Sequence, residues 1–102
     1  MTHTGFCVLH LQPRRLPHEP EAVRLPAEGE WEVALAYAAE RAVAWWDLNP
    51  VFPSRREAER YASLAPVETE VVPVEFTEER PDEEEGWFDS FRSPCWFRVI
   101  SA

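Results

Sequence analysis

The sequence predicts a small single-domain α+β protein, in which a mixed or antiparallel sheet of about three to five strands packs against one or two helices. Its length of 102 residues is close to the commonest size of one domain, so we expect residues 1–102 to share a single core. Hydrophobic residues make up 45% of the chain and aromatic residues 13%, which is enough to fold a chain with this much charge. Apolar residues alternate in some segments, as in strands, and recur at helical spacing in others.

Residues 5–12 have the pattern of an interior strand. Their side chains alternate between two largely apolar faces, one formed by Phe6, Val8 and His10 and the other by Cys7, Leu9 and Leu11. A strand that is apolar on both faces is typical of the middle of a sheet. Four prolines follow within residues 13–27, so we expect an irregular connection there, with a short extended piece at Ala22 to Leu25.

Residues 30–48 are compatible with two structures. A helix is favoured by six alanines between Ala34 and Ala44, and by an apolar stripe formed by Trp31, Leu35, Ala38, Ala42 and Trp45. The alternative is a hairpin of residues 31–38 with 42–48, because apolar side chains also alternate from 31 to 37. Its turn at 39–41 lacks the Gly, Asn or Asp that tight turns favour, so we prefer the helix. Asn49-Pro50 should end either element, since a residue before proline is pushed out of the helical region.

A second helix is predicted by a capping box at Ser54 to Glu57. The Ser54 hydroxyl can accept from the Glu57 amide, while the Glu57 side chain can reach back to the Ser54 amide. An apolar stripe at helical spacing follows, and the helix should run to about Leu64 and stop before Pro66.

Two further strands are predicted near the C-terminus. Val67 to Phe76 has strand composition, but its apolar residues change parity partway, which we interpret as a bulge near Val71-Val72. Pro73 indicates either an edge strand or that same bulge. Residues 95–100 alternate and are predicted to form the last strand.

Acidic residues gather in one segment. Ten arginines and no lysine oppose nineteen Asp and Glu, which leaves a net charge of −9. Residues 68–89 contain ten of these acids and one arginine, and we expect an exposed acidic loop at about 77–90. A field of this sign repels phosphate backbones and attracts basic surfaces, so we expect no direct nucleic-acid binding.

The residues that bear reactive groups form no complete motif. Cys7 and His10 have the spacing of half a zinc site, with His3, His18 and Cys95 as conceivable further ligands. Positions three apart on a strand point to opposite faces, so we predict no metal site. Cys7 has no neighbour that would activate a nucleophile, and no glycine-rich phosphate loop exists. We therefore predict no catalytic residue and no cofactor, and favour a binding protein over an enzyme.

The two cysteines and the N-terminal residues indicate the cellular compartment of the protein. We expect Cys7 and Cys95 to be buried thiols, with a disulfide between the chain ends as the alternative. The first ten residues lack the pattern of a signal peptide, and no apolar run is long enough to span a membrane. These features favour a cytoplasmic protein with no membrane contact.

Aromatic residues beside the acidic segment suggest where a partner would bind. An acidic surface speeds encounter with a basic protein, and exposed aromatic side chains supply the buried anchors. The alternative is that these aromatic residues fold back to close the core. The predicted partner-binding residues are Asp82, Glu83, Glu84, Glu85, Trp87, Phe88, Phe91 and Trp46.

Three functional hypotheses follow. The first is a small acidic factor, an antagonist or accessory protein, that docks on a basic surface of a nucleic-acid enzyme or a toxin. The second is a small-ligand-binding or enzymatic module near Asp47, with Asp47 or His10 as its polar group and a pocket of Trp31, Tyr37, Trp45 and Trp46. The third is a homo-oligomerisation module, such as a homodimer, paired through the strand around Pro73 or through the last strand.

Overall fold

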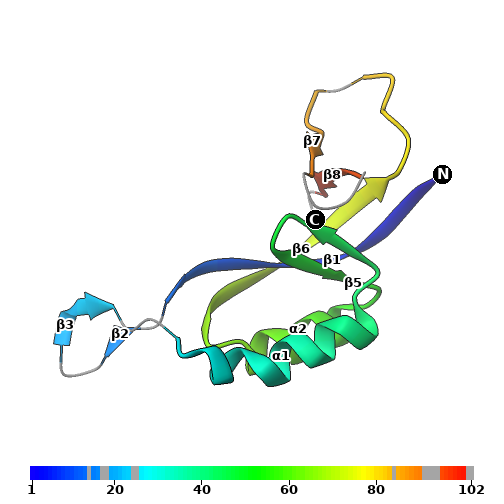
Figure 1. The fold of residues 1–102 in the computed structure, drawn as a ribbon. Coiled ribbons are helices and arrows are strands. Elements are labelled where there is room, and N and C mark those ends of the chain that lie inside the picture. The colour runs from blue at the N-terminus through cyan, green and yellow to red at the C-terminus, as the bar shows by residue number, and fades with distance from the viewer. Residues whose placement is uncertain (14, 17–18, 24–25, 84, 91–94, 101–102) are drawn as a thin grey trace.

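Two helices lie against a strongly curved six-stranded antiparallel sheet in the computed structural model of this chain (Figure 1). The structure describes residues 1–13, 15–16, 19–23, 26–83, 85–90 and 95–100. The predicted α+β class is confirmed, but the sheet has more strands than the three to five expected. In chain order the elements are β1 (Thr2–Pro13), β2 (Arg15–Leu16), β3 (Glu19–Val23), α1 (Glu28–Arg41), β4 (Ala44–Trp46), β5 (Asn49–Phe52), α2 (Arg55–Leu64), β6 (Val67–Thr77), β7 (Phe88–Asp89) and β8 (Trp96–Val99).

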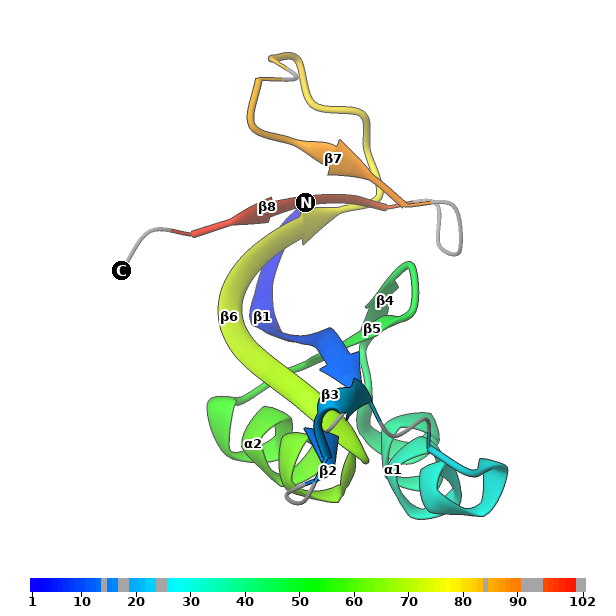
Figure 2. The same cartoon turned by 90° about the vertical axis from the view of Figure 1, so that its left-hand side faces the viewer.

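The strand order in the sheet is β4-β5-β1-β6-β8-β7, and every neighbouring pair is antiparallel. The additional strands include β4 and β7, which have three and two residues and are too short to leave a pattern in the sequence. The predicted interior position of residues 5–12 is confirmed, because β1 pairs with β5 on one side and with β6 on the other. Figure 2 shows β6 as a long arc that runs from the helices to β8.

Two apolar clusters cover opposite faces of this curved sheet. The first lies between the sheet and the helices, and its buried members are Val8, Ala34, Ala38, Phe52, Ala58, Tyr61, Ala65 and Val67. The second lies on the other face, and its buried members are Cys7, Ala44, Val51, Val74, Phe76, Cys95 and Phe97. The two faces of β1 predicted from its alternation therefore meet different cores, with Val8 in the first and Cys7 in the second.

The apolar residues of β6 change parity because they contact two different clusters. The predicted bulge near Val71-Val72 is wrong. Both residues pair with β1 in continuous register. Val67 and Val71 contact the first cluster, whereas Val72 and Val74 contact the second, because the covered face of the sheet changes along the strand. The irregularity lies instead on β1, where the register shifts between His10 and Gln12.

Pro73 lies where β6 becomes an edge of the sheet, because β8 pairs with β6 only from Val74 to Thr77, and the preceding residues of β6 pair with β1 alone among the described strands. Its carbonyl accepts a hydrogen bond from the Ile100 amide at 2.9 Å, on the side of β8. The N and O atoms of one strand residue point the same way, so the missing N–H of Pro73 removes no bond to Phe6, its partner on β1. The nitrogen of Pro73 points to the side on which β8 ends, so a proline is tolerated here, which agrees with the predicted edge position.

The segment 30–48 combines a helix with part of a hairpin. Helix α1 is confirmed but begins at Glu28 and ends at Arg41, before the predicted end at Leu48. The hairpin with a turn at 39–41 is wrong, and β4 pairs instead with β5 across Asp47 and Leu48. Asp47 has a φ of 57°, in the left-handed region that Asp adopts more readily than most residues. Asn49 and Pro50 begin β5 rather than end an element, which corrects the prediction.

Helix α2 begins where the capping box predicts. Ser54 is the N-cap, and its hydroxyl oxygen accepts from the Glu57 amide at 3.3 Å. The Glu57 carboxylate accepts from the Ser54 hydroxyl at 3.1 Å, rather than from the Ser54 amide as expected. The helix ends at Leu64, as predicted, and buries Ala58 and Tyr61.

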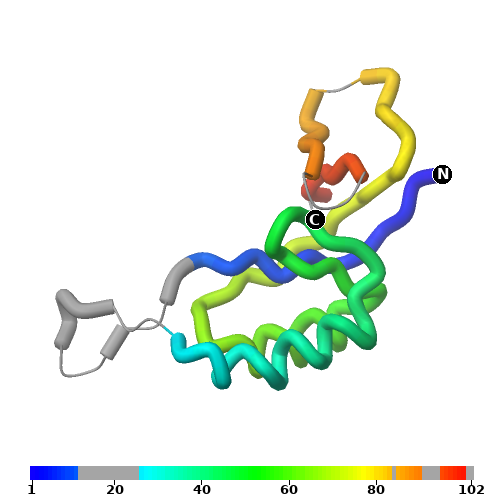
Figure 3. The backbone as a smooth tube through the Cα atoms, in the orientation of Figure 1, coloured from blue at the N-terminus to red at the C-terminus, as the bar shows by residue number. Residues whose placement is uncertain are grey.

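Residues 13–27 contain a short two-stranded ribbon of β2 and β3 that projects from the body of the molecule (Figure 1). Figure 3 traces the backbone of the rest of the fold, from β1 through the helices to β6. The extended piece predicted at Ala22 to Leu25 overlaps the end of β3, while residues 24 and 25 lie outside the described residues. Neither described helix is long and apolar enough to cross a membrane.

Gly5 allows β1 and β5 to approach closely, and we expect Gly5→Ala to lower the free energy of unfolding by about 1–3 kcal/mol. A Cβ at this position would lie 2.8 Å from the Phe52 carbonyl oxygen and 2.9 Å from Val51 Cγ1, so the sheet would have to shift. Urea denaturation measures the change. The matched control is Gly29→Ala in α1, where an added Cβ meets nothing within 4 Å beyond its chain neighbours and its own helix, and a gain of about 0.5–1 kcal/mol is expected. Equal stability of Gly5→Ala and the wild type would contradict the close approach.

Candidate functional site

A row of stacked aromatic rings connects the two edges of the curved sheet. Trp46 of β4 stacks on Phe97 of β8, with ring centroids 5.4 Å apart and planes 3° from parallel. Phe88 of β7 stacks on Trp46 at 5.9 Å, and Phe76 of β6 stacks on Phe97 at the same centroid distance, 5.9 Å. The first and last strands of the sheet order therefore meet through side chains rather than through a backbone ladder.

The Ser90 hydroxyl group adds hydrogen bonds between the same two edges of the sheet. The hydroxyl oxygen accepts from the Asp47 amide at 3.0 Å. Its proton can be donated to the Trp45 carbonyl or to Asp47 Oδ1, each 3.2 Å away. The β4–β5 turn is thereby bound to the segment that follows β7. Asp47 thus bonds the Ser90 side chain.

Phe88 is the exposed member of the aromatic row. Its side chain is 57% exposed, although one face of the ring rests on Trp46. Exposed acidic side chains precede and follow it, namely Glu78, Glu79, Asp82, Glu83, Glu85 and Asp89. The loop that carries them extends away from the helices (Figure 1). Glu84 and Phe91, two of the residues predicted to bind a partner, lie outside the described residues.

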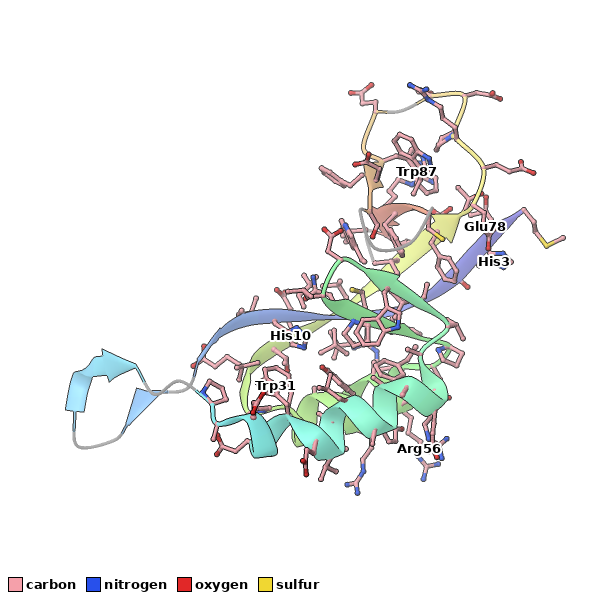
Figure 4. The ribbon with its side chains drawn as sticks, viewed as in Figure 1. His3, His10, Trp31, Arg56, Glu78 and Trp87 are labelled. Carbon is pink, nitrogen blue, oxygen red and sulfur yellow. The ribbon has the colours of Figure 1, made fainter. Side chains whose placement is uncertain are left out.

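Trp87 lies against the protein rather than outward. The Arg98 guanidinium is 4.7 Å from the centroid of the Trp87 ring, and Arg98 Nη2 is 2.9 Å from Glu75 Oε1. Arg80 similarly lies over Trp96, at 5.8 Å from the ring centroid. Figure 4 shows Trp87 within the loop. These contacts hold two arginines against aromatic rings, while the acidic side chains of the loop stay exposed.

A cavity of about 400 Å³ lies on the other face of the sheet, near the start of α1. His10 Nε2 is 2.8 Å from the Tyr61 hydroxyl, and the His10 ring meets the Trp31 ring edge-on with centroids 5.3 Å apart. Figure 4 shows His10 and Trp31 facing each other from β1 and α1. The cavity is lined by His10, Leu11, Trp31, Leu35, Leu48, Tyr61 and Val67.

Burial keeps the polar groups of this cavity neutral. It lowers the pKa of His10 below its ordinary value and raises the pKa of Tyr61 to about 12. Tyr61 is fully buried, and among the described residues only His10 bonds its hydroxyl. A buried hydroxyl proton without an acceptor costs about 1–3 kcal/mol, so Tyr61 donates to Nε2 and the His10 proton resides on Nδ1.

The cavity differs from the pocket expected near Asp47. Tyr37 packs on Phe52, with centroids 5.8 Å apart, and Trp46 belongs to the aromatic row. Trp45 packs against the first cluster. Of the predicted pocket residues only His10 and Trp31 come together at the cavity, and Leu48 rather than Asp47 lines it. Tyr61 was missed because its place in the apolar stripe of α2 indicates only a core residue.

The cysteines are both free and buried, which confirms the predicted thiols and excludes the alternative disulfide in this structure. Burial raises the pKa of Cys7 to about 12, and burial together with Glu78 raises that of Cys95. Neither is activated as a nucleophile. Cys7 and His10 lie on opposite faces of β1, as predicted, and His18 lies outside the described residues. Within the described part of the chain, no three His, Cys, Asp or Glu side chains are grouped as a metal ion requires.

The sequence matches no protein-family model, and neither the curated proteins nor the solved structures include one similar to it. Function must therefore be argued from the geometry of the surface and the cavity.

Proposed function

We propose that this protein is a small acidic binding factor, an antagonist or accessory protein, which acts in the cytoplasm by docking on a basic surface of another protein. A nucleic-acid enzyme or a toxin has a surface of this kind. The observation that carries the proposal is Phe88, whose side chain is 57% exposed among acidic residues and rests on Trp46. Large aromatic side chains in this position supply most of the binding energy of many interfaces.

The anchor is already ordered before a partner arrives. Phe88 stacks on Trp46, Trp46 stacks on Phe97, and the Ser90 hydroxyl connects the same segment to the β4–β5 turn. Ordering a side chain on binding costs about 0.5–1.5 kcal/mol, and a ring that is held in place avoids much of that cost. This arrangement supports Phe88 as the anchor, with Trp87 serving to pack the loop.

The charge of the loop supports a basic partner. Residues 77–90 contain seven acidic residues and one arginine, a net charge of −6 out of −9 for the chain. The single arginine, Arg80, lies over Trp96. An acidic surface of this density attracts a basic protein over several ångströms and accelerates encounter.

Affinity capture from the native lysate tests the proposal when the wild type is compared with two variants. Phe88→Ala should weaken retention of the captured partner about thirtyfold, the loss expected for an interface anchor. Replacement of Asp82, Glu83, Glu84 and Glu85 by the corresponding amides should slow association about tenfold. Raising the salt from about 0.05 M to about 0.5 M should remove most of the difference between this variant and the wild type.

The matched control neutralises acids elsewhere on the surface. Glu32, Glu40 and Glu70 are exposed and lie on α1 and β6, away from the loop. Their change to glutamine removes three negative charges, against four in the loop variant, and should leave capture unchanged. Equal loss of capture in the control and in the loop variant would show that binding depends on the net charge of the protein and not on the acidic loop. Capture that survives both Phe88→Ala and the loop variant would refute the proposal.

A further inference from the structure

We propose that the cavity between β1 and the helices is a binding site for a small uncharged aromatic molecule that carries a hydrogen-bond acceptor, such as a ketone. This site is separate from the acidic surface, because none of its described lining residues belongs to the acidic loop at 77–90. Its volume of about 400 Å³ lies within the range of roughly 300–1,000 Å³ that is usual for small-molecule sites.

The lining explains why the ligand would be aromatic or otherwise apolar. Leucines from three separate segments and Val67 surround Trp31, so most of the wall is hydrocarbon. The leucines are unusually exposed for their type, at 54% for Leu11, 48% for Leu35 and 59% for Leu48. An exposed apolar patch that surrounds a hollow is typical of a ligand-binding groove.

The hydrogen-bond donors of the cavity explain why the ligand would carry an acceptor. The imidazole uses Nε2 to accept from Tyr61, which leaves its Nδ1–H without a partner among the described residues. The Trp31 indole N–H likewise has no partner among them. Both free groups are donors, so the matching ligand presents an acceptor oxygen.

The charge state of the described lining favours an uncharged ligand. No carboxylate and no guanidinium is among the lining residues that the structure describes, so a cationic ligand would lose its hydration there without a counter-ion. Burial lowers the pKa of His10, and the chain has a net charge of −9, so an anion gains nothing here. A second copy of this chain is disfavoured as the occupant, because exposed Glu28 and Glu32 adjoin Trp31 and Leu35 on α1 and would face their equivalents.

Three naphthalene probes of similar shape test the site by NMR titration of the full chain. We expect 2-acetylnaphthalene to bind about tenfold more tightly than 2-ethylnaphthalene, which lacks the acceptor oxygen. The anion 2-naphthoate should bind most weakly of the three. Chemical-shift changes should concentrate at the ring of His10, the indole of Trp31 and the amides of Leu35 and Leu48.

Matched variants on α1 distinguish binding in the cavity from nonspecific hydrophobic binding to the surface. Leu35→Glu should abolish binding of 2-acetylnaphthalene, whereas Val33→Glu, at a position that is 61% exposed and does not line the cavity, should preserve it. His10→Phe keeps an aromatic ring and should remove the preference for the ketone, with a native-like spectrum as proof of folding.

Several results would overturn the proposal. One is equal binding of the ketone and the ethyl compound to the wild type, and another is loss of binding in both glutamate variants. A dimer by light scattering, with the lining residues broadened in the NMR spectrum, would assign the cavity to a second copy. Binding of the anion above the ketone would show that the charge argument is wrong.

Discussion

Tyr61→Ala is expected to lower the free energy of unfolding by about 3–5 kcal/mol, a large fraction of the stability of a domain of this size. Tyr61 is fully buried in the first cluster, where its ring packs on Phe52 with centroids 5.5 Å apart. Its hydroxyl also bonds His10, so the substitution leaves both a cavity and an unpaired imidazole. Denaturant unfolding followed by far-UV circular dichroism measures the loss.

Tyr61→Phe separates the hydroxyl from the ring. It should cost about 1 kcal/mol at neutral pH, the usual value of one hydrogen bond. The folded pKa of Tyr61 is raised from 10.0 to about 12, so the unfolded chain loses this proton first as the pH rises. The wild type should therefore lose stability between pH 10 and 12 more steeply than Tyr61→Phe does. Parallel stability curves over that interval would show that the hydroxyl is not buried as described.

Trp46→Ala should have the second largest effect, a loss of about 2–3 kcal/mol, less than for a fully buried tryptophan because Trp46 is only partly buried. The substitution removes the ring between Phe88 and Phe97. The contact between β4 and the β7–β8 edge would then depend on Ser90 alone among the contacts described above. Hydrogen exchange should therefore accelerate for β7 and the residues beside it more than for β1.

Trp46→Phe is the matched control, because it keeps an aromatic ring in the row. It should restore most of the slow exchange of β7 and about half of the lost stability. In the capture experiment, Trp46→Ala should weaken binding less than Phe88→Ala does, because we propose that Trp46 contributes chiefly by holding the more exposed Phe88 in place. Uniform acceleration of exchange across β1 and β7 would mean that Trp46 supports the whole fold and not the closure of the sheet.

Much of the fold could be predicted wherever neighbouring residues decide the structure. The Ser54 capping box located the start of α2, because its hydrogen bonds join residues three apart. The alternation of residues 5–12 indicated an interior strand because side chains point to opposite faces in turn. In both cases the observed structure agrees.

Predictions failed where distant segments decide the outcome. Trp45 completes the apolar stripe of the predicted helix, yet Trp45 and Trp46 lie in β4, because pairing with β5 and the stacking of Trp46 on Phe97 stabilise the strand. The parity change along β6 was attributed to a bulge, although it reflects a change of the covered face. Neither cause is visible in a window of ten residues.

The sequence by itself determined the α+β class, the interior strand β1, the cap of α2 and the acidic segment that surrounds Phe88. These depend on composition, on spacing and on contacts between near neighbours. The tertiary structure alone decided that Phe88 is held on Trp46, that Trp87 lies under Arg98, and that His10 meets Tyr61 beside Trp31. Those contacts join residues that are not near neighbours in the chain, and the stacking of Phe88 on Trp46 also requires the sheet to curve until its first and last strands meet.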